Sequence, residues 1–193
     1  MITSIISNNC MGGVICHRHN IKMNSPTVKL QVMPEDYAKF CANIHHYMEV
    51  DVKEYIELSD KDKAKLVRMY DEIPDCPYGI LDDIMLVFLH YDNFEYAQRM
   101  WYRRRERIDW DHLAYIMHIH YQGRGYEKEI QEFLDLNLPH SAAFTNGFKV
   151  GNSYMFTVPD IEGIDDFGWY NGQYTIEMGS GYNEAEFLGL KGE

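Results

Sequence analysis

Residues 5–13 read IISNNCMGG, and this stretch decides the fold class that the sequence predicts. Its first residues are apolar and β-branched, which is typical of a buried strand. Asn8 and Asn9 tolerate turn conformations, and Gly12 and Gly13 let the backbone approach another group closely. A buried strand that runs into such a loop, and from there into a helix near Gly13, is typical of an α/β ligand-binding protein.

The same loop predicts a binding site. A helix that starts near Gly13 directs its first backbone N–H groups into the space beside the loop, where they attract a phosphate or a sugar diphosphate. The stretch has neither the GxGxxG spacing nor the Lys-Ser/Thr ending of the formal nucleotide motifs, so the alternative is an ordinary tight turn between strand and helix. The predicted ligand-binding residues of this loop are Asn8, Asn9, Cys10, Gly12 and Gly13.

Composition limits the classes of protein that the chain can belong to. A chain of 193 residues with 46% hydrophobic content can bury one sizeable core, so we expect a single domain over residues 1–193, with residues 145–193 as a C-terminal extension. The net charge of −12 repels nucleic acid, which we therefore exclude as a partner. Neither a transmembrane-length apolar stretch nor a basic leader is found, so we expect a cytoplasmic protein whose four cysteines are reduced.

Further along the chain, strand-like and helix-like segments alternate, which indicates an α/β layer structure with a largely parallel sheet. The most apolar segment, residues 78–91, is the expected central strand, with its core at residues 84–89. The charged segment 59–70 is expected to be a solvated surface helix capped by Ser59. Other strands are expected at residues 27–33, 51–58, 112–121 and 141–145, and other helices at residues 34–48, 94–107 and 126–136.

The last fifty residues are rich in glycine and aromatic residues, and we expect them to form irregular or hairpin structure packed against the sheet. Their aromatic rings either cover the core or form a platform on which a sugar stacks. The rings concerned include Phe148, Tyr154, Phe156, Phe167, Trp169, Tyr170 and Tyr174.

Several short motifs occur in an order that resembles a bacterial exopolysaccharide-biosynthesis family of unknown biochemical activity. They are SNNCMGG, NSPT, PEDYAKF, GILDDI, FLHY and RIDWD, together with Trp101, Arg104 and the pair Phe144 and Thr145. The resemblance covers most of the first 145 residues, and it departs from the family pattern at Met11, where Trp is usual, and at residues 122–125. It implies a cytoplasmic role in making capsular or extracellular polysaccharide within a Rossmann-like α/β architecture.

Loops that follow parallel strands converge at one edge of a sheet, and this rule selects further candidate residues. They are His90 and Tyr91 after the expected central strand, and Gln122 and Arg124 after the strand at residues 112–121. A diphosphate there can accept hydrogen bonds from backbone N–H groups and from an arginine, while His90 serves as the catalytic acid or base. Arg104, in the arginine run at residues 103–105, is a further candidate phosphate contact; the alternative is a run that faces water or pairs with acidic side chains.

Three other chemical interpretations remain open. Cys10 beside a helix N-terminus has a lowered pKa and is a candidate nucleophile, or it is a small packed residue. The histidine pairs at positions 17 and 19, 45 and 46, and 118 and 120 are either metal ligands or hydrogen-bonded structural residues. Asp82 and Asp83 resemble the metal-binding carboxylates of glycosyltransferases, but their position before an apolar strand favours a role in a turn or in positioning a neighbouring arginine.

The leading functional hypothesis is a transferase that acts on an activated or lipid-linked sugar, with a nucleotide sugar or sugar phosphate as its small-molecule partner. The second hypothesis is a noncatalytic subunit that binds a sugar phosphate or another protein of the same pathway. A small hydrolase that uses Cys10 and a histidine is the third. The sequence predicts no particular cofactor and no oligomeric state.

Overall fold

The computed structural model describes residues 1–119, 125–156 and 181–190. These residues form two four-stranded sheets, with strand orders β1-β6-β7-β8 and β2-β5-β4-β3. The first sheet is parallel and the second is antiparallel. The chain is therefore a mixed α/β protein, and the largely parallel sheet expected from the sequence accounts for only one of the two sheets.

The parallel sheet contains β1 (Ser4–Ser7), β6 (Leu113–Ile119), β7 (Ser141–Asn146) and β8 (Tyr154–Phe156). β6 lies between β1 and β7 and is buried along its whole length. A strand covered on both faces is apolar at nearly every position, which explains the run LAYIMHI. This strand and those at the N-terminus and at residues 141–145 confirm the sequence predictions, within two residues at their ends.

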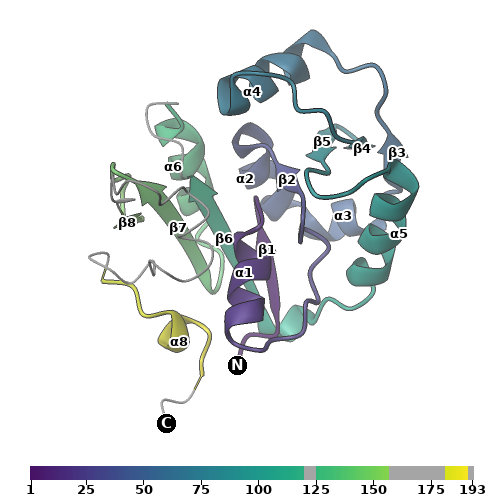
Figure 1. The fold of residues 1–193 in the computed structure, drawn as a ribbon. Helices are drawn as coiled ribbons and strands as arrows, with labels where there is room; N and C mark the ends of the chain where they lie inside the picture. The colour runs from purple at the N-terminus through teal and green to yellow at the C-terminus, as the bar shows by residue number, and fades with distance from the viewer. Residues whose placement is uncertain (120–124, 157–180, 191–193) are drawn as a thin grey trace, which may run out of the picture.

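Helices pack on both faces of the parallel sheet (Figure 1). On one face, α1 (Met11–Arg18) buries Met11 and Ile15 in a cluster with Ile116 of β6. On the other face, α2 (Pro34–Ala42) and α6 (Glu127–Asp135) share a cluster with Met117. Adjacent strand residues point to opposite faces, so β6 contributes to both clusters.

The antiparallel sheet overturns one prediction. Residues 78–91 do not form the central strand of a parallel sheet; they form a hairpin of β4 (Tyr78–Leu81) and β5 (Ile84–Val87). Asp82 turns the chain with a positive φ of 58°, a conformation that Asp tolerates and that two-residue hairpin turns require. The apolar run of β5 is still explained by burial, since β5 lies inside the antiparallel sheet between β4 and β2 (Gln31–Val32).

Two other expected strands are much shorter than predicted. Only β2 forms within residues 27–33, and only β3 (Lys53–Glu54) forms within residues 51–58. The segment before β2 is instead a turn whose residues 26–28 are buried and whose exposed Lys29 has φ 69°, a conformation that ends strand geometry. The two sheets meet next to this turn, because the Val32 N–H donates to the carbonyl of Asn8 at 2.8 Å.

The helices in the first half of the chain follow local capping signals. α4 (Asp60–Tyr70) starts after Ser59, whose hydroxyl accepts a hydrogen bond from the Asp62 N–H at 3.1 Å, as predicted. α5 (Phe94–Arg105) also confirms its prediction and starts after Asn93. The helix expected at residues 34–48 is divided at the nonhelical Asn43 into α2 and α3 (Ile44–Glu49).

α4 is not the fully solvated helix that its charges indicate. Its Lys65 lies 2.6 Å from Asp36 of α2 and 2.9 Å from Asp62, and all three side chains are largely buried. Arg68, one turn further, contacts Glu35 of α2 and Glu129 of α6. The charges of α4 therefore hold it against two other helices.

The 3-10 helix η1 (Trp110–His112) directly precedes β6. After β6 the chain forms α6 and then returns to the parallel sheet as β7 and β8. β8 runs parallel to β7, so these two strands do not form a hairpin, and the irregular or hairpin structure expected for residues 157–180 falls outside the described residues. α8 (Glu184–Phe187) is held by Glu184, which accepts two hydrogen bonds from Arg18 at 3.0 and 3.1 Å. Phe167, Trp169, Tyr170 and Tyr174 lie outside the described residues.

None of the helices within the described ranges has the length and apolar character needed to cross a membrane. One buried cluster contains residues of both sheets, among them Met117 and Leu86, and the single domain over residues 1–193 stays a prediction.

Candidate functional site

Buried polar side chains collect at the carboxyl ends of three parallel strands. Ser7, Asn8 and Asn9 follow or end β1, His118 lies near the end of β6, and Thr145 ends β7 together with Asn146. Polar groups are rarely buried unless they are hydrogen-bonded, and ligands of open α/β sheets bind at this edge. The carboxyl edge of the parallel sheet is therefore the candidate site.

Asn9 is linked to His118 by the central contact of this edge. Its Nδ2 lies 2.9 Å from the ring Nδ1 of His118 and donates to the His118 carbonyl at 3.1 Å. An amide nitrogen only donates, so Nδ1 of His118 is the acceptor in this contact. Asn8 completes the link, since its Oδ1 accepts from the His118 N–H at 2.7 Å. Of the two alternatives left open for the histidine pairs, His118 fits the hydrogen-bonded structural residue.

Two backbone N–H groups at the start of α1 already donate hydrogen bonds to side chains of the preceding loop. Asn9 Oδ1 accepts from the Met11 N–H at 3.0 Å, and Ser7 Oγ accepts from the Gly12 N–H at 3.1 Å. These two backbone groups are among the first N–H groups of the helix, which an anion was expected to contact. Binding of an anion at α1 therefore depends on the remaining backbone N–H groups of its first turn and on the side chains around them.

The two glycines of the loop have a packing role. A Cβ atom at Gly12 would lie 2.7 Å from Ser7 Oγ, and one at Gly13 would lie 3.1 Å from Val28 Cγ1. Both glycines thus allow α1 to approach its own strand and the turn before β2. Their predicted contact with a ligand remains a prediction.

Cys10 is not the activated thiol that a helix N-terminus predicts. Burial raises its pKa to about 11, and a hydrogen bond from the backbone of Lys29 offsets this effect only in part. The thiol is therefore protonated at neutral pH. The direction of the pKa shift expected from the helix dipole is wrong, because desolvation of the thiolate outweighs the dipole.

Lys29 brings two of the predicted site residues into one region. Its backbone reaches Cys10 after β1, and its charge acts on His90 after β5. His90 is exposed as a residue, but its ring is partly enclosed, and this burial together with the charge of Lys29 lowers its pKa. The imidazole is therefore neutral at physiological pH. Sequence reasoning missed Lys29, although a polar residue in a tight turn beside the first loop was a usable signal.

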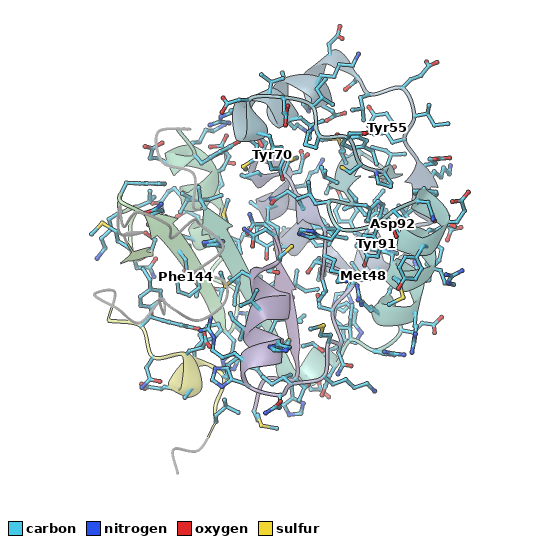
Figure 2. All side chains as sticks on the ribbon, in the orientation of Figure 1. Met48, Tyr55, Tyr70, Tyr91, Asp92 and Phe144 are labelled. Carbon is cyan, nitrogen blue, oxygen red and sulfur yellow. The ribbon has the colours of Figure 1, made fainter. Side chains whose placement is uncertain are left out.

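Tyr91 and Arg104 also come together, but they contact each other and the backbone. Arg104 Nη1 donates to the Tyr91 hydroxyl at 2.6 Å and to the Val28 carbonyl at 3.0 Å. Tyr91, at the end of the antiparallel sheet next to α5 (Figure 2), donates to the same carbonyl at 3.2 Å. Both side chains are more than nine-tenths buried, so they hold the turn that carries Lys29.

Some of the other candidate residues have structural roles, and others lie outside the described residues. Within the described part of the chain, no group of three His, Cys, Asp or Glu side chains is arranged to hold a metal ion. His45 stacks on Trp110, and His46 contacts Asp82 at 3.1 Å. Asp82 and Asp83 form the hairpin turn, as predicted. Gln122, Arg124 and His120 lie outside the described residues.

Comparison with known proteins places the chain in a family. A family model described as a domain of unknown function, DUF1919, matches residues 2–158, and the chain therefore belongs to that family. An uncharacterized protein of Haemophilus influenzae is 29% identical over 143 residues, which are 74% of this chain. The match covers 61% of that relative's length, so the chain spans less than two thirds of it. Neither description mentions exopolysaccharide.

Proposed function

We propose that this member of the DUF1919 family is a transferase of bacterial exopolysaccharide assembly that acts on an activated or lipid-linked sugar. In this proposal the parallel sheet works as it does in Rossmann-like folds, with the donor bound at its carboxyl edge. The observation that carries the proposal is the position of Lys29, whose backbone donates a hydrogen bond to Cys10 at the start of α1 and whose charge lowers the pKa of His90 after β5.

Each group has a chemical role in the proposed transfer. The Lys29 ammonium and the remaining N–H groups of α1 contact the phosphate groups of the donor. His90 is neutral because its pKa is lowered, so it can accept the proton of the acceptor hydroxyl. The hydroxyl oxygen forms a bond to the anomeric carbon, the bond from that carbon to the phosphate oxygen breaks, and the phosphate leaves with its electron pair.

Asn9 and His118 are positioning residues in this proposal. Their hydrogen bonds fix the loop after β1 to β6, and the loop in turn fixes Cys10 and the start of α1. A transferase gains rate from such fixed geometry, because the reacting groups do not have to be ordered during the reaction.

The second candidate is a noncatalytic subunit that binds a sugar phosphate. It is favoured by the internal hydrogen bonds of the Met11 and Gly12 N–H groups, which leave fewer donors for stabilising charge in a transition state. The protonated Cys10 thiol argues against the third hypothesis, a hydrolase with a cysteine nucleophile.

Thermal unfolding in the presence of nucleotide sugars, nucleoside diphosphates, sugar phosphates and divalent metal ions tests the proposal. A ligand at 100 times its Kd stabilises the native state by about 2.7 kcal/mol, which raises the Tm of a chain of this length by roughly 5–11 °C. Lys29→Gln should remove most of this shift, and Lys22→Gln, an exposed lysine of the same connection, is the matched control.

A hit is then tested for turnover with an acceptor glycan. His90→Ala should keep the thermal shift and lose the turnover if the protein is a transferase. Ligand binding without turnover in the wild-type protein favours the binding subunit. A shift that survives Lys29→Gln, or the lack of any shift with phosphate-bearing ligands, contradicts the proposed site.

A further inference from the structure

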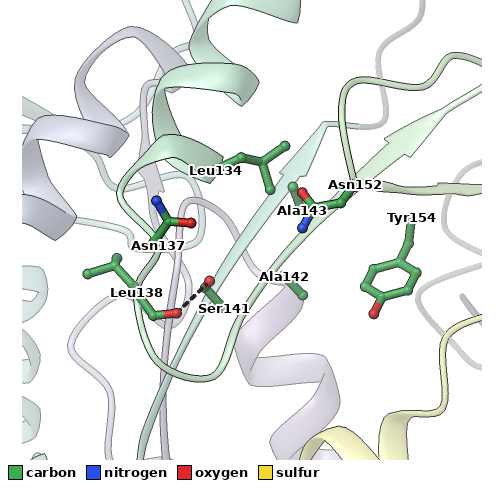
Figure 3. A pocket seen from close by; sticks show the side chains of 8 residues that line it. All are labelled: Leu134, Asn137, Leu138, Ser141, Ala142, Ala143, Asn152 and Tyr154. Carbon is green, nitrogen blue, oxygen red and sulfur yellow. Dashed lines mark hydrogen bonds between the residues drawn. The ribbon is translucent and has the colours of Figure 1, made fainter.

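A separate pocket of about 220 Å³ lies at the opposite end of β7 from the candidate site (Figure 3). Its walls come from the end of α6, the first residues of β7 and the chain just before and within β8. The lining residues are Leu134, Asn137, Leu138, Ser141, Ala142, Ala143, Asn152 and Tyr154. None of them belongs to the candidate donor site.

The strand pairing leaves this space open. β8 joins β7 only from the pair of Phe144 with Tyr154 onward, so the edge of β7 at Ser141, Ala142 and Ala143 has no β8 residue paired to it. The side chains of Ala142 and Ala143 are small and almost fully buried. Small side chains at an uncovered strand edge leave room beside the backbone, which itself offers donors and acceptors.

The polar walls are set by the turn between α6 and β7. Asn137 has a positive φ of 48°, the left-handed conformation that commonly ends a helix and that Asn adopts more readily than most residues. Three residues later, His140 has φ 49° and turns the chain into β7. The Ser141 hydroxyl donates to the Leu138 carbonyl at 2.8 Å, which fixes the hydroxyl while its oxygen can still accept.

The lining chemistry selects the class of ligand. Asn152 presents a carboxamide that both donates and accepts, whereas Asn137 offers chiefly its amide oxygen, because its Nδ2 donates to the Asp135 carbonyl at 2.8 Å. Tyr154 lines the pocket and adds a hydroxyl, while its ring stacks on Phe144. Leu134 and Leu138 supply apolar surface. The lining contains no charged side chain, so a charged ligand would lose its hydration without gaining a counter-ion.

We infer that this pocket binds one ring of a neutral sugar. The amide and hydroxyl groups of the lining match neighbouring sugar hydroxyls, and the two leucine side chains can contact part of the C–H face of the ring. Its volume is below the roughly 300–1,000 Å³ of sites for drug-sized ligands, so a single monosaccharide unit fills it. The inference does not depend on the proposed transfer, because the two sites share no residue.

Saturation-transfer NMR on the full chain, followed by calorimetric titration, tests the inference with glucose, galactose and N-acetylglucosamine. Glucose 6-phosphate and glucuronic acid serve as charged counterparts. We expect at least one neutral sugar to bind with a millimolar Kd and to bind more tightly than either charged sugar.

Variants then assign the site. Asn152→Ala removes amide hydrogen bonds and should weaken binding about 5-fold to 100-fold, and Asn152→Leu, which fills the pocket, should abolish it. Asn152 is exposed, so the fold should persist, and an unchanged Tm checks this. Lys128→Ala on the exposed face of α6 is the matched control and should leave binding unchanged.

Three results overturn the inference. They are the absence of binding by all three neutral sugars, equal or tighter binding of the charged sugars, and unchanged binding in both Asn152 variants. If sugar binding is lost in Lys29→Gln but kept in Asn152→Leu, the sugar binds at the donor site instead. This result would overturn the present inference without contradicting the proposed function.

Discussion

Replacing Lys65 by methionine should destabilise the protein severely, although the sequence presents this residue as one lysine of a charged surface helix. The Nζ atom of Lys65 lies 2.6 Å from Asp36 and 2.9 Å from Asp62. The side chain is only 7% exposed, and so is that of Asp36. Lys65→Met therefore leaves two carboxylates near each other without their cation, in a region largely closed to water.

The size of the effect follows from the cost of an uncompensated buried charge. Removal of one partner from a buried ion pair costs about 3–5 kcal/mol. For a chain of this length, each kcal/mol lowers the Tm by roughly 2–4 °C, so the expected loss is on the order of 6–20 °C. Lys63→Met is the matched control on the same helix, because Lys63 is 47% exposed and its partner Asp60 is fully exposed. Exposed pairs contribute about 0–1 kcal/mol.

The pH dependence has a defined sign. Burial opposes the ionisation of Asp62, but hydrogen bonds from Ser59, Lys65 and Tyr55 lower its pKa below the usual value. The contribution of Asp62 to the free energy of unfolding is therefore present at neutral pH and is lost as the pH falls through the folded-state pKa. Burial likewise opposes the charge of Lys65, but Asp36 and Asp62 raise its pKa, so its contribution is lost only as the pH rises through that raised value. The cluster stabilises the fold most between about pH 5 and pH 9.

Urea unfolding of the wild-type protein, Lys65→Met and Lys63→Met at pH 7 and at pH 4.5 measures both effects. The difference between wild type and Lys65→Met should shrink at the lower pH, where the carboxylates of the variant can take up protons. If Lys65→Met and Lys63→Met lose the same small free energy at pH 7, the burial argument is wrong.

Three further predictions concern the loop after β1 and the C-terminal helix. Alkylation of Cys10 by iodoacetamide, followed by peptide mass spectrometry, should be slow at pH 7 and rise with a midpoint near pH 11; a midpoint below pH 8 contradicts the burial of this thiol. Gly12→Ala should cost about 1–3 kcal/mol in chemical denaturation despite the better helix propensity of alanine, because its Cβ meets Ser7 Oγ at 2.7 Å. Glu184→Gln should weaken the contact with Arg18 and speed amide exchange of α8 while α1 stays protected, whereas unchanged exchange in α8 shows that the ion pair is not what holds it.

Local elements whose signals lie within a few residues follow from the amino-acid sequence alone. Ser59 at the start of α4 and the apolar run of β6 are examples, because capping and hydrophobic periodicity act over one or two turns or over one strand. The sequence also placed Asn8 and Asn9 in a turn between a strand and a helix, because turn-forming residues directly follow the apolar strand residues.

The pairing of the strands and the contacts between distant polar groups depend instead on how the whole chain packs. The apolar residues of β5 suit a parallel or an antiparallel sheet equally well, and the left-handed Asp82 turned them into a hairpin. The contact between Asn9 and His118 joins positions 109 residues apart, and no local pattern encodes it. The raised pKa of Cys10 has the same origin, because a dipole can be predicted from neighbouring residues, whereas desolvation depends on everything that packs around the thiol.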